Sequence, residues 1–73
     1  MSRTFVITGG AKGIGRCMVE YFASKGDKVY FIDNDAKTTI VVGNQLRGKG
    51  WDVHDFVGDI ADKKTLIDFA AKV

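Results

Sequence analysis

Apolar residues in this chain gather in three short runs. The runs lie at Thr4–Thr8, Val29–Ile32 and Trp51–Val57. Each is rich in β-branched and aromatic residues, which are the residues that favour β-strands. The second run is apolar at almost every position, as is typical of a strand covered on both faces. The pattern therefore predicts three strands, the second of them buried inside a sheet.

Apolar residues at helical spacing follow each predicted strand. The first helix should begin near Ile14 and end before Gly26, since glycine suits a helix C-terminus. The second should run from about Asp35 to Gly48, although its threonines and valines are poor helix formers. Asp62 can cap the third. The residues expected to face the core are Ile14, Met18, Tyr21 and Phe22, then Ala36, Ile40, Gly43 and Leu46, then Leu66, Phe69, Ala70 and Val73.

Strand and helix alternate three times with short links between them. This order predicts an α/β fold with parallel strands joined by right-handed crossovers. It corresponds to the first βαβαβα half of a Rossmann-type, three-layer, doubly wound parallel sheet, which is the half that binds a mononucleotide. The 73 residues have room for one small domain.

A glycine-rich stretch separates the first strand from the first helix. It reads Thr8-Gly9-Gly10-Ala11-Lys12-Gly13-Ile14-Gly15. A strand, a glycine-rich turn and a helix together present backbone N–H groups and the positive end of a helix to a diphosphate. A glycine-rich loop in some other kind of α/β protein is the alternative. We expect a dinucleotide to bind at Thr8, Gly9, Lys12, Gly13, Ile14 and Gly15.

The spacing T-G-x-x-x-G-x-G resembles the short-chain dehydrogenase/reductase family. Two further features stand in the family's order, Asp33 at the end of the second strand and Gly58-Asp59-Ile60 after the third. In that family an aspartate at the position of Asp59 accepts a hydrogen bond from the adenine amino group, and the backbone at the position of Ile60 helps to hold the ring. The resemblance implies an NAD(P)-dependent oxidoreductase that interconverts alcohols and carbonyls, with a dinucleotide and a small-molecule substrate as partners. It also implies a homo-oligomer.

Asp33 decides the expected cofactor. A dinucleotide-binding fold places an acidic residue at this point against the adenosine ribose, and Asn34 follows it here. A carboxylate accepts hydrogen bonds from both ribose hydroxyls and repels a 2′-phosphate, which favours NAD. The alternative is that Asp33 or Asp35 only caps the next helix, and we assign that cap to Asp35.

Lys12 argues in the opposite direction. In the resembled family, a lysine before the second glycine can attract the extra phosphate of NADP, and Arg16 could strengthen that field. An ordinary surface lysine is the alternative. Because a carboxylate at Asp33 beside a phosphate dianion is costly, we expect NAD rather than NADP.

Catalytic residues are not expected in this sequence. Tyr21 and Lys25 match the family's Y-x-x-x-K pair, but they lie on the first helix instead of a much later one, so Tyr21 is expected to pack in the core. We interpret residues 1–73 as the N-terminal part of an NAD(P)-binding Rossmann domain without its catalytic half. This piece alone should be inactive, and its first strand should form an open edge of the sheet.

Two other functions stay open. Nucleotide-sugar epimerases and dehydratases usually show T-G-x-x-G-x-x-G, whereas Lys12 occupies the place of their second glycine. A non-catalytic nucleotide-binding or interaction module is the other alternative.

Composition narrows the remaining classes. The net charge of +2 comes without a basic stripe, so no nucleic-acid partner is expected. The single cysteine, Cys17, fits a reducing, cytoplasmic setting and a place in the core. The first apolar run is too short for a signal peptide or membrane span. No metal site is expected; His54 should lie on a strand surface and Trp51 should pack.

Overall fold

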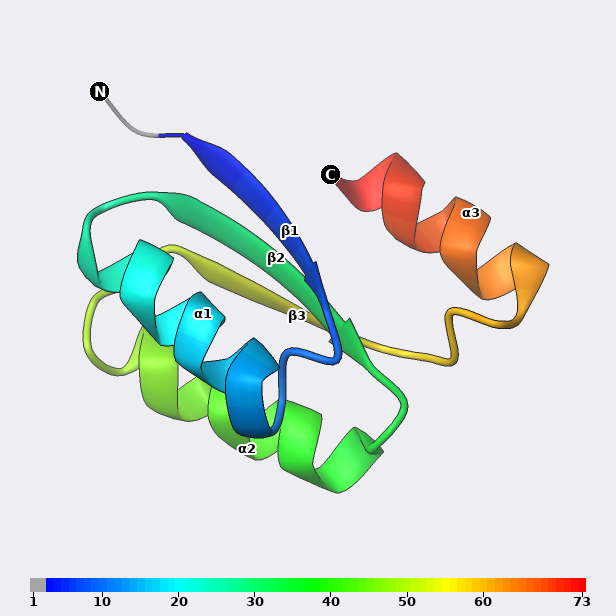
Figure 1. Ribbon diagram of the computed structural model, residues 1–73, viewed down its shortest axis with the longest axis horizontal. Helices are drawn as coiled ribbons and strands as arrows, with labels where there is room; N and C mark the ends of the chain where they lie inside the picture. The colour runs from blue at the N-terminus through cyan, green and yellow to red at the C-terminus, as the bar shows by residue number, and fades with distance from the viewer. Residues whose placement is uncertain (1–2) are drawn as a thin grey trace.

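A computed structural model describes residues 3–73 as a three-stranded parallel sheet with three helices (Figure 1). The strands lie in the order β1-β2-β3. The elements along the chain are β1 (Thr4–Thr8), α1 (Gly13–Ser24), β2 (Lys28–Asp33), α2 (Ala36–Arg47), β3 (Val53–Val57) and α3 (Lys63–Lys72).

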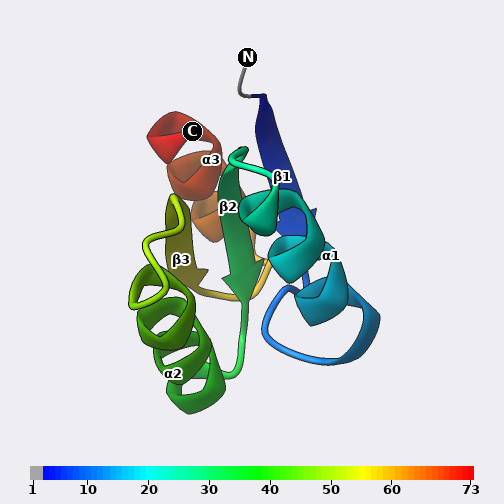
Figure 2. The same cartoon turned by 90° about the vertical axis from the view of Figure 1, so that its left-hand side faces the viewer.

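The helices cover both faces of the sheet. Figure 2 shows α1 and α2 together on one face and α3 on the other. Three layers around a parallel sheet with alternating strands and helices are the predicted first half of a Rossmann-type fold, and the prediction is confirmed.

The register of the sheet brings the ends of the three strands to one edge. Thr8 pairs with Ile32, and Asp33 pairs with Val57. The ladder continues by one residue, since the Gly9 amide donates to the Ile32 carbonyl over 2.8 Å. The turns that follow β1, β2 and β3 therefore meet at the carboxyl edge of the sheet.

The main core lies between the sheet and the two helices on its first face. β2 runs through its centre, and Val29, Phe31 and Ile32 have no exposed surface, as predicted for a strand covered on both faces. Trp51 packs partly against this core. The buried residues of the cluster are Ile7, Ala11, Val19, Ala23, Val29, Phe31, Val42, Leu46 and Val53.

The predicted inner face of α1 is largely wrong. The helix carries two apolar stripes, and the sheet covers the one formed by Val19, Phe22 and Ala23. Phe22 was expected inside, and it stacks on Phe5 with ring centroids 3.9 Å apart. The second stripe faces outward, with Ile14 80% exposed; its members are Ile14, Cys17, Met18 and Tyr21, so the core position expected for Cys17 is also wrong.

The other two helices also depart from the expected faces. In α2, the predicted Gly43 and Leu46 are buried, but Thr39 and Val42 are buried in place of Ala36 and Ile40. In α3 only Phe69 is buried, where its ring lies 5.4 Å from that of Phe56. The predicted inner residues that are exposed instead are Ala36, Ile40, Leu66, Ala70 and Val73.

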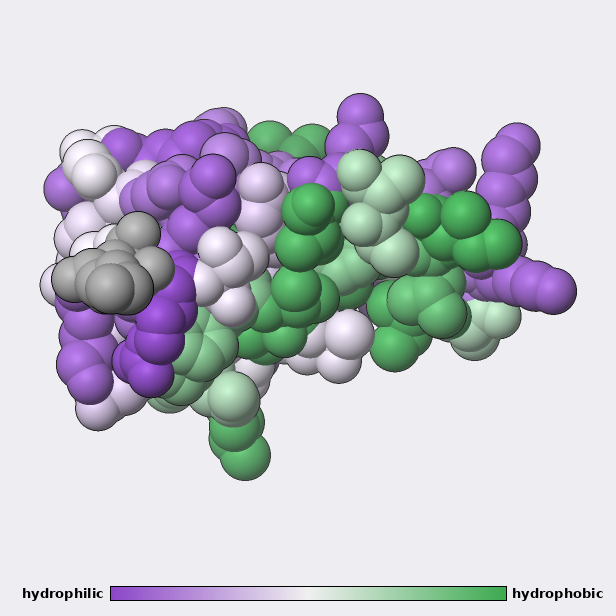
Figure 3. All heavy atoms as spheres, turned by 90° about the horizontal axis from the view of Figure 1, so that it is seen from above, coloured by the Kyte–Doolittle hydropathy of each residue, from purple (hydrophilic) through white to green (hydrophobic). Residues whose placement is uncertain are grey.

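Among the described residues, β1 pairs with β2 on one side and with no strand on the other. Val6 in the middle of this strand is 51% exposed. Figure 3 shows this side of the molecule, where hydrophobic residues form a band of surface over its middle and right-hand part. The expected open edge is therefore confirmed.

Candidate functional site

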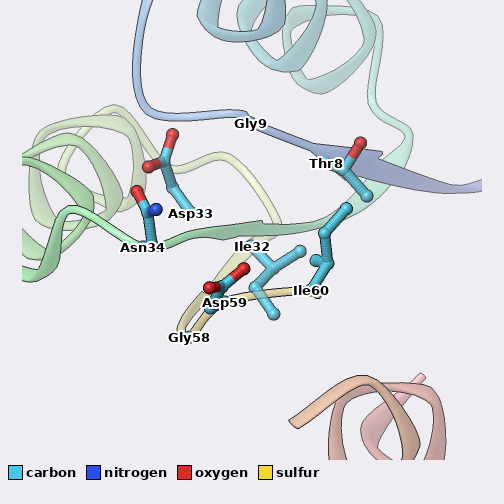
Figure 4. Close-up of a pocket in the computed structure, with 8 residues that line it drawn as sticks. All are labelled: Thr8, Gly9, Ile32, Asp33, Asn34, Gly58, Asp59 and Ile60. Atoms are coloured by element: carbon cyan, nitrogen blue, oxygen red, sulfur yellow. The ribbon is translucent and has the colours of Figure 1, made fainter. Parts of the chain in front are cut away.

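A pocket of about 300 Å³ opens at the carboxyl edge of the sheet (Figure 4). The turns after all three strands contribute to it, in the crevice where open α/β sheets bind their ligands. Except for Ile32, every residue of its wall is one that was expected from the sequence to bind a dinucleotide. The lining residues are Thr8, Gly9, Ile32, Asp33, Asn34, Gly58, Asp59 and Ile60.

The turn after β1 needs glycine at two predicted positions. Gly9 has a φ of +67°, which side chains rarely adopt. A Cβ on Gly15 would lie 2.0 Å from the carbonyl oxygen of Gly9. The helix can therefore approach the turn this closely only when residue 15 has no side chain.

Gly10 is a third structural requirement, and the sequence motif leaves its position unspecified. A Cβ there would lie 2.6 Å from the Cβ of Phe31 on β2. The neighbouring Ala11 is also buried. The doubled glycine was the available signal for this close contact between the turn and the sheet.

Gly13, Ile14 and Gly15 form the first turn of α1 and lie outside the lining of the pocket. The first amide groups of a helix have no acceptor within it, and the helix dipole makes this end positive. Lys12 occupies the N-cap position without a side-chain hydrogen bond to the helix. This end of α1 can receive an anion.

Asp33 joins two segments around the pocket. Its Oδ2 accepts from the Ala11 amide at 3.3 Å and its Oδ1 from the Asp35 amide at 3.1 Å. Figure 4 shows its side chain pointing toward the turn that follows β1. The carboxylate is therefore held in place at the pocket wall, where it retains acceptor capacity for a ligand.

The cap of α2 is Asp35, as expected. Its Oδ1 accepts from the amide of Thr38 at 3.2 Å. The alternative that Asp33 caps this helix is wrong, because the Asp33 side chain bonds the Ala11 and Asp35 amides instead.

Lys12 forms an ion pair with Asp35, with 2.7 Å between Nζ and Oδ2. The hydrogen bond to Asp35 raises the pKa of Lys12 above its usual 10.5. The hydrogen bond from Lys12, followed by that from the Thr38 amide, lowers the pKa of Asp35 to about 2. This contact could not be predicted from the sequence, because the two residues belong to different turns.

Asp59 organises the turn after β3. Its Oδ1 accepts from the amide of Ala61 at 2.9 Å, so it adopts the turn that Gly-Asp sequences often form. A Cβ on Gly58 would lie 2.3 Å from Cγ2 of Thr65 in α3. Asp59 itself is exposed, and its carboxylate can accept further hydrogen bonds.

Tyr21 and Lys25 contact each other on the outer surface of α1. The Lys25 ammonium donates to the Tyr21 hydroxyl at 3.1 Å and lies 4.6 Å from the centre of its ring. Tyr21 is 57% exposed, so the expected core position is wrong. Neither residue lines the pocket at the carboxyl edge of the sheet.

Residues 3–73 contain neither a metal-binding cluster nor a membrane-spanning helix. Within that range, no group of three or more His, Cys, Asp or Glu side chains is arranged to hold a metal ion. No helix in the same range has the length and apolar character needed to cross a membrane. His54 is exposed on β3, as expected, with its ring stacked on Tyr30.

Comparison with known proteins decides the family. A protein-family model described as short chain dehydrogenase matches residues 3–73 of this sequence. This chain belongs to the short-chain dehydrogenase family. A Thermotoga maritima protein named as an uncharacterized oxidoreductase is 33% identical over 92% of this chain and 26% of its own.

Solved structures of short-chain dehydrogenases share the same fold. One from Burkholderia phymatum, in complex with NAD, has a TM-score of 0.92 and 28% identity over 97% of this chain and 25% of its own. A metagenomic short-chain oxidoreductase in complex with NADP has a TM-score of 0.85 over 99% of this chain and 33% of its own; at 22% identity it shows the fold alone. The chain thus spans between a quarter and a third of these relatives' lengths.

Proposed function

We propose that this chain forms the adenosine-binding part of an NAD-dependent short-chain dehydrogenase that interconverts alcohols and carbonyls. The observation that carries the proposal is the position of Asp33. Its carboxylate lies at the end of β2, in the wall of a pocket shared with the turns after β1 and β3. A pocket of about 300 Å³ is at the lower end of the range for small-molecule sites.

The glycine-rich turn fits a diphosphate. A Cβ added at Gly9 or Gly13 would meet no atom within 4 Å, so the backbone there is open to a ligand, whereas Gly15 lets α1 lie close against the turn. The amides of Gly13, Ile14 and Gly15 can donate to phosphate oxygens there, aided by the helix dipole. Thr8 lines the adjoining pocket.

The pocket wall fits the adenosine portion of NAD. Asp33 would accept hydrogen bonds from the ribose hydroxyls, with Asn34 beside it. The Asp59 carboxylate would accept from the adenine amino group, while Gly58 and Ile60 hold the ring. A 2′-phosphate on the ribose would meet the Asp33 carboxylate, so NAD is favoured over NADP.

The described residues bind and orient the cofactor rather than transfer protons. NAD, when bound, supplies or accepts the hydride. We assign no catalytic residue to this chain, and we propose a small alcohol or carbonyl compound as the substrate of the whole protein.

Titration with NADH and NADPH tests this proposal directly. In the native full-length protein, followed by fluorescence of the reduced cofactor, we expect NADH to bind more tightly by about tenfold or more. The Asp33→Ala variant should lose NADH affinity by a similar factor, because one or two hydrogen bonds to a charged group disappear, while NADPH affinity changes less. Tighter binding of NADPH to the unmodified protein would contradict the proposal.

A further inference from the structure

Lys12 and Asp35 connect the turn before α1 to the start of α2. The Lys12 ammonium and the Asp35 carboxylate are 2.7 Å apart. The Lys12 side chain is 62% exposed and the Asp35 side chain is 32% exposed. The second carboxylate oxygen of Asp35 accepts from the Thr38 amide. The capping hydrogen bond holds the Asp35 side chain in one position. The ion pair with Asp35 therefore holds the Lys12 ammonium in one position as well.

Both residues adjoin Asp33 through the backbone. The Asp33 side chain accepts from the amide of Ala11, directly before Lys12, and from the amide of Asp35. The two carboxylates and the lysine therefore occupy one corner beside the pocket. Asp33, Asp35 and Lys12 together carry a net charge of −1. Without the Asp35 carboxylate, the net charge of this corner would be zero.

A lysine in this corner would otherwise favour a phosphate on the ribose. A dianion there needs a cation that is free to donate hydrogen bonds, as Lys and Arg do when they bind phosphate. In this structure the Lys12 ammonium is already bound by Asp35. An incoming 2′-phosphate would have to compete with that carboxylate and approach two negative charges.

We infer that Asp35 is a specificity-determining positioning residue, which favours NAD over NADP by holding the Lys12 ammonium in an ion pair. This inference rests on the proposed function. It gives the NAD preference two sources, repulsion by Asp33 and sequestration of Lys12 by Asp35, and the second acts only through the lysine.

The test uses Asp35→Asn in the native full-length protein. Asparagine is also a good N-cap, so the variant removes the charge and keeps the start of α2. Asp35→Ser, which caps but is too short to hold the lysine in the same way, is a second variant. Asp62→Asn makes the same chemical change at the N-cap of α3, where the side chain accepts from the Lys64 amide, and serves as the matched control.

We expect NADPH to bind about tenfold more tightly to Asp35→Asn, with NADH affinity changed by less than about twofold. Asp62→Asn should leave the ratio of the two affinities unchanged. Adding Lys12→Met to Asp35→Asn should abolish the gain for NADPH. Nuclear magnetic resonance of the Lys12 side chain without cofactor should show its pKa falling in Asp35→Asn, because the paired carboxylate is gone. The loss of the NADPH gain when Lys12→Met is added is the result that a purely structural role of Asp35 would not give.

Each contrary result has a distinct meaning. If Asp33→Ala weakens NADH binding but Asp35→Asn and Asp35→Ser leave the affinity ratio unchanged, the inference is overturned and the proposed function stands. The inference also fails if Lys12→Met does not cancel the gain. If the unmodified protein binds neither dinucleotide, the proposed function and the inference fail together.

Discussion

Asp33 and Asp35 are separated by one residue, yet they have different partners. Asp33 accepts from two backbone amides at the wall of the pocket, and Asp35 caps α2 while it pairs with Lys12. Strand geometry explains the division. Asp33 ends β2 at the sheet edge, whereas Asp35 lies beyond the strand, immediately before the first turn of α2.

The pKa of Asp35 predicts how acid affects the fold. The pKa of Asp35 in the folded chain is about 2, below the ordinary 3.8, so the ionised carboxylate stabilises the native state at pH values above 3.8. That contribution is lost as the pH falls toward 2. We expect the free energy of unfolding of the unmodified chain to fall more over this interval than that of Asp35→Asn. Urea denaturation of both proteins at several pH values measures the difference, and parallel curves would contradict the expectation.

Gly15→Ala tests the close contact between α1 and the turn. The new Cβ would lie 2.0 Å from the Gly9 carbonyl oxygen, so the backbone must shift. We expect the free energy of unfolding to fall by about 1–3 kcal/mol and dinucleotide binding to weaken sharply. Gly48→Ala is the control, because Gly48 has an ordinary helical φ of −62° and its added Cβ would lie 3.3 Å from the Asn44 carbonyl oxygen. Equal losses in the two variants would argue against a special role for Gly15.

At the scale of elements, the sequence predicted the number, type and order of all six helices and strands. Alternating strand and helix patterns are local properties of the chain, so they could be recognised without a structure. The ends of the strands could also be placed, which is why nearly all the pocket lining was predicted. That Ile32 also lines the pocket was missed, because an apolar strand residue gives no sign of whether it borders a cavity.

The inward faces of the helices could not be predicted with the same success. α1 has two apolar stripes at helical spacing, Val19, Phe22 and Ala23 on one side and Ile14, Met18 and Tyr21 on the other. Spacing alone cannot choose between them. The choice depends on how the glycine-rich turn sets the rotation of α1 against the sheet, and the ion pair of Lys12 with Asp35 depends on the same tertiary arrangement.

α2 contains a buried polar group that offers a test of packing. Thr39 has no exposed surface, and its hydroxyl has no hydrogen-bond partner within residues 3–73. Thr39→Val keeps the branched shape and removes the hydroxyl, so we expect a gain of about 1 kcal/mol in the free energy of unfolding. Thermal and urea denaturation would measure it.

Thr38→Val is the matched control for this gain. Thr38 is only half-buried, and its side chain helps to lower the pKa of the Asp35 carboxyl, so the same substitution one position earlier should destabilise the chain. Destabilisation by Thr39→Val would show that its hydroxyl has a partner after all.

At the scale of the whole molecule, the open side of β1 dominates the expected behaviour of these 73 residues in isolation. Unpaired amides and carbonyls on a strand edge favour pairing with another chain. The exposed Val6 and the second stripe of α1 add apolar surface. We expect the isolated 73-residue chain to be marginally stable or to associate with a second copy.

Val6→Lys tests association through this strand. A lysine on an edge strand opposes pairing, so the variant should sediment as a monomer at concentrations where the unmodified 73-residue chain associates. Ile67→Lys places the same charge on an exposed apolar position of α3 and should change association little if β1 is responsible. A monodisperse, cooperatively melting monomer of the unmodified chain would contradict the expectation.

The most direct test of the central proposal is to map where NAD binds. Backbone amide resonances of the ¹⁵N-labelled native protein would be followed during titration with NAD. Within residues 3–73, we predict the largest shifts in the glycine-rich turn from Thr8 to Gly15, at Asp33 and Asn34, and at Gly58 to Ile60. Shifts centred instead on Tyr30, His54 and Phe56, which line a separate hollow beside α3, or no shifts at saturating NAD, would contradict it.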